Sequence, residues 1–89
     1  MLFVAGHAIA RFIERIAPYL TYEQAEAIVL ADVKDIQLDD LRQAQSNWYV
    51  RVTSKSTGRK GLPYRYRAFI AQQELSPERG LMVVTIHRG

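Results

Sequence analysis

The stretch NWYVRVTS, residues 47–54, decides how the second half of the chain folds. Trp48, Val50 and Val52 occupy one set of alternate positions in this stretch, and Arg51 and Thr53 occupy the other. Because successive side chains of a strand point to opposite faces of a sheet, this alternation predicts a strand with one buried and one exposed face.

Two more strands are predicted after it, over residues 64–72 and 81–87. The faces of the first carry Tyr64, Tyr66, Ala68 and Ile70 on one side, and Arg65, Arg67 and Phe69 on the other. The faces of the second carry Met82, Val84 and Ile86 on one side, and Leu81, Val83, Thr85 and His87 on the other. Residues 54–63, rich in Gly, Ser, Thr and positive charge, predict a loop, and residues 76–80 predict a turn.

The first half of the chain predicts a short strand over residues 2–5 and then two helices. Apolar side chains recur at helical spacing over residues 7–17, and Pro18 stops this first helix. The members of its stripe are Ile9, Phe12, Ile13 and Ile16. A second helix begins at Thr21, where Thr21 and Gln24 fit a capping box, and ends near residues 33–35.

Residues 36–46 leave two interpretations open: a short third helix capped by Asp39, or a long connection. The element order is therefore β-α-α-β-β-β, which predicts an α+β fold in which two N-terminal helices pack on a small antiparallel sheet. The other face of the sheet is then open to water or to a ligand. A length of 89 residues suits one domain, 1–89, with one core.

The composition is that of a globular protein, with 48% apolar and 24% charged residues. The chain has no cysteine, which fits a reducing compartment and leaves no disulfide or thiolate metal site. The apolar start of the chain lacks a basic region and contains His7, so it does not read as a signal peptide. Because no apolar run approaches the ~20 residues of a membrane span, we expect a cytoplasmic protein without a membrane partner.

Charge is divided unevenly along the chain. Residues 1–46 hold four basic and seven acidic side chains, which gives −3, and residues 47–89 hold eight basic and two acidic ones, which gives +6. Residues 55–67 hold five basic side chains and no acid. This asymmetry indicates an anionic partner, and the alternative is a solvated face with incidental charge.

The basic half predicts a surface for unpaired nucleic acid. Arginine makes bidentate contacts with phosphate, and aromatic faces stack on bases. The candidate binding residues are Tyr49, Arg51, Lys55, Arg59, Lys60, Arg65 and Arg67. Trp48 and Tyr66 belong to the same aromatic group, but their positions favour the core.

Two histidines are the candidate proton-transfer groups. His7 opens the first predicted helix and shares one side of it with Arg11 and Glu14. The positive end of the helix dipole favours a neutral imidazole there, which can act as a general base. His87 lies on the last predicted strand, two residues after Thr85. The alternative for both histidines is an ordinary exposed position, because nothing in the sequence shows that they meet.

A ribonuclease without a metal needs a proton acceptor, a proton donor and a cation that holds the developing charge. The two histidines together with arginine would supply these groups. No cofactor is expected, because residues 56–61 lack the spacing of a phosphate-binding loop. Two distant histidines without cysteine also do not form the ligand pattern of a catalytic zinc site.

The run HAIARFIER, residues 7–15, followed by the capped helix from Thr21 and the strands ending in VVTI, residues 83–86, resembles a known group. It is similar to the small barnase–EndoU–colicin–RelE-like nucleases, especially their phage and toxin branches. The resemblance implies a metal-independent endoribonuclease whose site includes His7, Arg11 and Thr85, with arginines that match only in kind. It also implies an antitoxin or a host protein as a partner. The chain lacks the lysine-rich helix of the ribosome-dependent toxins.

Three hypotheses follow: a ribonuclease, a non-catalytic module that binds nucleic acid through the basic sheet, and a small protein that binds an acidic protein surface. Members of one fold differ in function, so the fold does not decide among them. A homodimer through an edge strand is compatible with all three. The ribonuclease hypothesis requires that His7, His87 and the strand arginines converge in one cleft.

Overall fold

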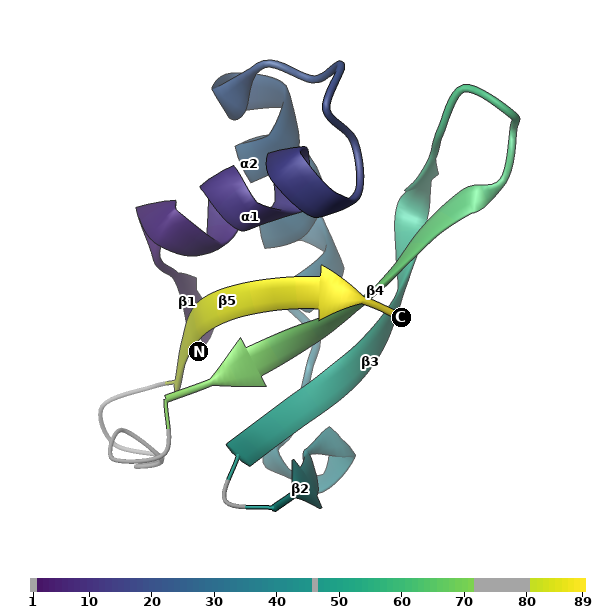
Figure 1. Cartoon of the computed structure of the whole chain (residues 1–89). Helices are drawn as coiled ribbons and strands as arrows, with labels where there is room; N and C mark the ends of the chain where they lie inside the picture. Colours follow the sequence, from purple (N-terminus) through teal and green to yellow (C-terminus); the bar gives the residue numbers. More distant parts are fainter. Residues whose placement is uncertain (1, 46, 72–80) are drawn as a thin grey trace.

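A computed structural model describes residues 2–45, 47–71 and 81–89 (Figure 1). The elements in chain order are β1 (Leu2–Val4), α1 (Gly6–Arg15), α2 (Tyr22–Val33), the 3-10 helix η1 (Leu38–Asp40), β2 (Arg42–Ala44), β3 (Asn47–Thr57), β4 (Pro63–Ile70) and β5 (Leu81–Arg88). The fold is α+β, and its order matches the predicted β-α-α-β-β-β except for the added strand β2. Neither described α-helix is long and apolar enough to cross a membrane.

The five strands form one sheet in the order β1-β5-β4-β3-β2. β1 runs parallel to β5, with Phe3 opposite Met82, whereas the other three pairs are antiparallel. The sheet is therefore mixed, and the prediction of a purely antiparallel sheet was wrong in this respect. Side-chain alternation specifies the face that a residue takes, but it does not specify the direction of the neighbouring strand.

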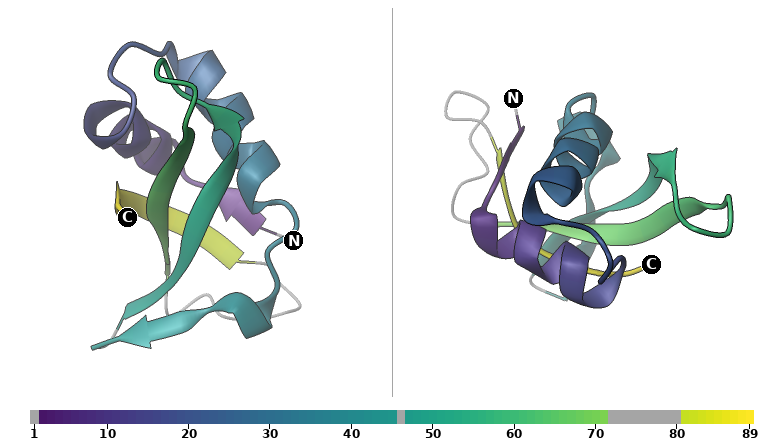
Figure 2. Two further views of the ribbon diagram at one scale, coloured as in Figure 1. Left: turned by 90° about the vertical axis from the view of Figure 1, so that its right-hand side faces the viewer. Right: turned by 90° about the horizontal axis from the view of Figure 1, so that it is seen from above.

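Both helices lie on the same side of the sheet, as predicted, with α1 over β5 and α2 over β3 (Figure 2). Phe12 is fully buried between the layers and makes edge-to-face contacts with Tyr64 and Tyr66, at ring-centroid distances of 5.6 and 5.2 Å. Tyr66 is buried and Trp48 packs against the core half-buried, so the assignment of both to the core is confirmed. Within the described parts of the chain, no helix covers the opposite side of β3, β4 and β5.

The predicted capping box is confirmed at the start of α2. The backbone N–H of Gln24 donates to the Thr21 hydroxyl, and the backbone N–H of Thr21 donates to the Gln24 side chain. α1 ends at Arg15, two residues before the predicted end, because the N–H groups of Ile16 and Ala17 both turn back to the carbonyl of Phe12. The bond from Ala17 spans five residues instead of four, which breaks the regular ladder of the helix and ends it.

Neither interpretation of residues 36–46 was right. The segment forms η1 and the short exposed strand β2, whose Arg42 lies opposite Tyr49 of β3. The carboxylate of Asp40, rather than Asp39, caps η1 by accepting the backbone N–H of Gln37. An exposed three-residue strand leaves no alternation from which it could be predicted.

The loop between β3 and β4 is shorter than predicted, because β3 continues to Thr57 and β4 begins at Pro63. The alternation of both strands is confirmed: buried side chains of β4 are Tyr64, Tyr66, Ala68 and Ile70.

In β5, the predicted faces are wrong from Val83 toward the start of the strand, since Val83 is buried together with Ile86. The register between β4 and β5 shifts between Phe69 and Ile70, and this bulge moves Val83 to the helical side. The predicted turn over residues 76–80 and the predicted strand end at Gln72 lie outside the described residues.

Candidate nucleic-acid interface

The side of the sheet without helices, here called the open face, aligns two of the predicted cations with a histidine. Arg51 of β3 lies opposite Arg67 of β4, and Arg67 lies opposite His87 of β5. The alternation of the three strands turns all three side chains away from the helices. Three residues from separate parts of the chain therefore form one row across the sheet.

An aromatic row lies next to this cationic row. The rings of Tyr49 and Phe69 are stacked, with centroids 5.6 Å apart and planes inclined by 29°. Phe69 also meets the imidazole of His87 edge-on at 4.9 Å, and the guanidinium of Arg67 lies 5.8 Å from the Phe69 centroid. Thr85 lies opposite Phe69 and completes this part of the face.

Three arginines meet where β5 ends, around His87; we call Arg15, Arg67 and Arg88 the arginine cluster. Each uses one nitrogen to donate to a backbone carbonyl nearby: Arg15 to Ile86 at 2.8 Å, Arg67 to Arg88 at 3.1 Å, and Arg88 to Arg15 at 2.9 Å. The acceptors of all three bonds are backbone carbonyls, so these bonds orient the guanidinium groups without neutralising their charge. The cluster lines a depression of about 400 Å³ together with His87 and Glu14.

The contact between Arg15 and His87 is a stacking contact. Nη1 of Arg15 lies 3.3 Å from Nδ1 and 3.4 Å from Nε2 of the imidazole. A nitrogen equally far from both ring nitrogens would collide with Cε1 if it lay in the ring plane, so it lies over the face of the ring. Partial burial of His87, and then the positive charges of Arg15, Arg67 and Arg11, lower the pKa of the imidazole below its usual value. The neutral form is therefore favoured at neutral pH.

Positive charge is unbalanced on the open face and at the adjoining end of β5, where Arg88 lies opposite Tyr66 and so turns toward the helical side. Within residues 2–45, 47–71 and 81–89, ion pairs form only between Arg11 and Glu14, at 2.7 Å, and between Lys55 and Asp35, at 3.0 Å. The arginine cluster and Arg51 therefore have no carboxylate partner among the described residues. Arginines held close together without counter-charges have a strong electrostatic attraction for anions.

Several predicted cations lie away from the row. Arg65 is exposed on the open face opposite Thr53, but Lys55 pairs with Asp35 after α2. Arg59 lies over the ring of Tyr19, 4.1 Å from its centroid, in the loop between β3 and β4. Lys60 is exposed in the same loop, which projects from the body of the molecule (Figure 1).

His7 is also separate from the cluster. It is exposed in the first turn of α1, and it does not line the depression around His87. Arg15 follows eight residues later, which corresponds to about 12 Å along the helix axis. Of the predicted group on this helix, Arg11 and Glu14 contact each other. The structure thus brings Arg51, Arg67, Thr85 and His87 onto one face, without His7.

Sequence reasoning missed two members of the site, Arg15 and Arg88. Arg15 stands in the quoted run of α1, but its contact with β5 spans 71 residues of sequence. Arg88 continues the last predicted strand by one residue, and its guanidinium reaches the end of α1. Only the packing of α1 on β5 joins them.

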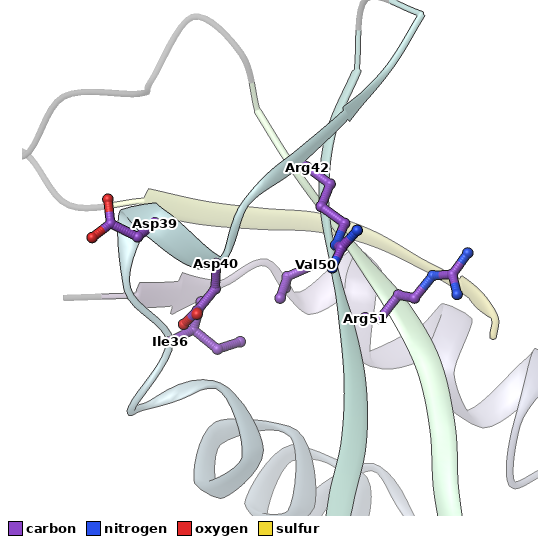
Figure 3. Close-up of a pocket in the computed structure, with 6 residues that line it drawn as sticks. All are labelled: Ile36, Asp39, Asp40, Arg42, Val50 and Arg51. Carbon is purple, nitrogen blue, oxygen red and sulfur yellow. The ribbon is translucent and has the colours of Figure 1, made fainter.

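A second depression, of about 440 Å³, opens beside the free edge of β3 (Figure 3). Arg42 and Arg51 lie toward one side of it, and Asp39 and Asp40 lie toward the other. Arg51 thus borders both this depression and the open face. No group of three His, Cys, Asp or Glu side chains in the described parts of the chain is placed to hold a metal ion.

Comparison with protein-family models, with curated protein sequences and with solved structures gives no significant match to this chain. The resemblance to small nucleases therefore rests on the residues of the chain alone.

Proposed function

We propose that the open face binds single-stranded RNA. The observation that carries the proposal is the row Arg51–Arg67–His87 running beside the stacked rings of Tyr49 and Phe69. Phosphate groups would contact the cationic row, and unpaired bases would stack on the aromatic row. Stacking of one base on an aromatic side chain contributes about 1–3 kcal/mol.

The aromatic row favours a single strand over a duplex, because the base faces of a duplex are hidden within its stack. We propose RNA and not DNA as the ligand because of the resemblance to ribonucleases. The proposal also includes a cytoplasmic location. The described positions of β3, β4 and β5 carry no carboxylate, and the acidic side chains near the face lie at its margins, Asp39 and Asp40 beside Arg51 and Glu14 beside His87.

The proposal is tested by fluorescence anisotropy with a labelled single strand of about 12 nucleotides, a length within the usual range of site sizes. Changing both Arg51 and Arg67 to Ala should weaken binding and flatten the dependence of log K on log salt concentration by about 1.4, since each lost phosphate contact changes a single-strand slope by about 0.7. Lys34→Ala is the matched control, because this exposed lysine lies at the end of α2 on the helical side.

The control variant should bind like the wild type. If the double variant, which removes two charges, loses only twice the binding free energy that the control loses by removing one, the attraction is a diffuse effect of net charge and the proposed face is refuted. Phe69→Leu separates the aromatic contribution, because it keeps an apolar side chain and removes the stacking surface. Affinity for RNA unchanged in this variant would show that no base stacks there.

The ribonuclease hypothesis in the form that the sequence suggested required His7 and His87 in one cleft, and the structure does not bring them together. Cleavage of the bound RNA through His87 alone is a different, second candidate, favoured by one observation. His87 is the one histidine within the arginine cluster, and its lowered pKa leaves a neutral imidazole that can accept a proton from a 2′-hydroxyl. The arginines around it are placed to stabilise negative charge on a phosphate in the transition state. His7, expected from the resemblance to take part, lies outside this cluster.

The test is cleavage of a mixed RNA pool in the presence of a metal chelator. His87→Ala should abolish cleavage, and His7→Ala should leave it unchanged. The reverse pattern would return the proton transfer to His7 and refute the role of His87. Binding without cleavage by the wild type would make the protein a binding module.

A further inference from the structure

We infer that the arginine cluster binds the terminal phosphate of an RNA strand, a phosphomonoester, rather than a phosphodiester within the strand, so this use of the cluster is an alternative to cleavage beside His87. The inference rests on the proposed function, because the strand that supplies this end lies on the open face. It assigns the terminal phosphate to the depression at the end of β5, which shares Arg67 and His87 with the cationic row, while the body of the RNA lies along the rest of the open face.

The first argument is that the guanidinium groups are fixed before any ligand arrives. Arg15, Arg67 and Arg88 each donate through one nitrogen to a backbone carbonyl, and none of them pairs with a carboxylate among the described residues. These bonds restrict the three long side chains in the free protein and so reduce the cost of ordering them. Binding of an anion then loses little side-chain entropy.

The second argument is the amount of charge. Glu14 also lines the depression, but its carboxylate pairs with Arg11 at 2.7 Å, so it does not neutralise the cluster. The C-terminus of α1 contributes a partial charge of about −0.5 at most. Three guanidinium groups thus exceed what a phosphodiester with one negative charge requires. A terminal phosphate carries about −1.5 to −2 at neutral pH and matches the site better.

The third argument is continuity with the aromatic row. His87 contacts Phe69, and Phe69 stacks on Tyr49, so ring contacts lead from the depression across the sheet to β3. A nucleotide whose phosphate lies among the arginines can place its base against these rings. A phosphorylated peptide would use the arginines but would leave the aromatic row without a function, so RNA is the ligand that the face favours.

His87 supplies an independent signal of occupancy. It faces Arg15, Arg11 and Glu14 from α1, Arg67 and Phe69 from β4, and Arg88 on its own strand. The positive charges lower its pKa in the free protein, and a bound dianion would offset them. Occupation of the cluster should therefore raise the pKa of His87.

The experiment compares three single-stranded RNAs of one base sequence: one with hydroxyl groups at both ends, one with a 5′-phosphate and one with a 3′-phosphate. One phosphorylated RNA should bind about ten to a hundred times more tightly than the hydroxyl-ended RNA, as expected for added charge-assisted hydrogen bonds. The better of the two identifies which end is recognised. Equal binding of all three would overturn the inference while leaving the proposed function intact.

Variants separate the two sites. Arg88→Gln keeps a donor for the carbonyl of Arg15 and removes the charge. It should therefore lower the preference for a phosphorylated end without lowering the affinity for the hydroxyl-ended RNA. Arg51→Ala is the matched control and should lower the affinity for all three RNAs by the same factor. Arg15→Gln is the second cluster variant should Arg88→Gln fail to fold. A preference unchanged in a folded cluster variant would overturn the inference.

Nuclear magnetic resonance of His87 gives a readout that does not depend on binding of a longer RNA. Titration with the preferred nucleoside monophosphate should raise the pKa of His87, whereas the unphosphorylated nucleoside should leave it unchanged. No change with either ligand would refute the site. A phosphoserine peptide that binds as tightly as the phosphorylated RNA would overturn the assignment of the ligand to RNA.

Discussion

Removal of one hydroxyl group from the core, by Tyr66→Phe, tests how the helical layer is joined to the sheet. The Tyr66 hydroxyl donates to one carboxylate oxygen of Asp32 in α2 at 2.8 Å, and the backbone N–H of Lys55 in β3 donates to the other at 2.9 Å. Asp32 is buried, with 8% of its surface exposed. Burial and the neighbouring Asp32 charge raise the pKa of Tyr66, so the phenol keeps its proton and donates it.

The magnitude follows from the charge of the acceptor. A hydrogen bond to a charged group contributes about 1.5–3 kcal/mol, and its loss leaves a buried carboxylate oxygen without a partner. Phenylalanine fills nearly the same volume as tyrosine, so no cavity adds to the cost. We expect the free energy of unfolding to fall by about 2 kcal/mol, which lowers Tm by about 8–16 °C in a domain of this size.

Urea denaturation followed by the fluorescence of the single tryptophan, Trp48, measures the change. Tyr64→Phe is the matched control, because its hydroxyl bonds to the neutral hydroxyl of Tyr19 at 2.9 Å and its loss should cost less, about 0.5–1.5 kcal/mol. In an Asp32→Asn background the cost of Tyr66→Phe should fall to the same smaller range. A decrease in the free energy of unfolding below about 0.5 kcal/mol in the wild-type background would refute the reasoning, because a buried carboxylate oxygen without a partner destabilises the folded state by more than this.

Three further outcomes are expected. Thr21→Ala removes the side-chain half of the capping box and should lower the free energy of unfolding by about 1 kcal/mol in urea denaturation, with no change in the extent of α2 by circular dichroism. Phe12→Ala removes a fully buried ring and should cost about 3–5 kcal/mol, so a folded protein with wild-type Tm would contradict the described core. His87 should titrate below pH 6.5 by nuclear magnetic resonance, and Arg15→Ala should move its pKa upward. Because the pKa of His87 is lower folded than unfolded, its contribution to stability is complete above the unfolded pKa and declines as pH falls through it.

Much of the architecture could be predicted because it rests on local patterns. The capping box at Thr21 and the alternation over residues 47–54 both act within a few residues, and both are confirmed. The errors arose where tertiary contacts override local preference. β2 forms because Arg42 to Ala44 can pair with β3, and Val83 turns inward because the register of β5 shifts against β4.

The candidate site divides in the same way. Arg51, Arg67 and His87 were predicted individually, since strand alternation places each on the exposed side of its own strand. That they stand in one row depends on the strand register, which the alternation does not contain. His7 was expected beside them from the resemblance, but it lies at the opposite end of α1 from Arg15.

The amino-acid sequence by itself determined the α+β class, the order of the two helices and the strands that follow them, and the faces of residues 47–53 in β3 and 64–70 in β4. Helical spacing, alternation and capping are properties of neighbouring residues and can be read along the chain. The tertiary structure alone decided the parallel pairing of β1 with β5 and the arginine cluster around His87. The bonds of Arg15 and Arg88 in that cluster join α1 to β5 across 71 to 73 residues, and such contacts exist only once the helices have packed on the sheet.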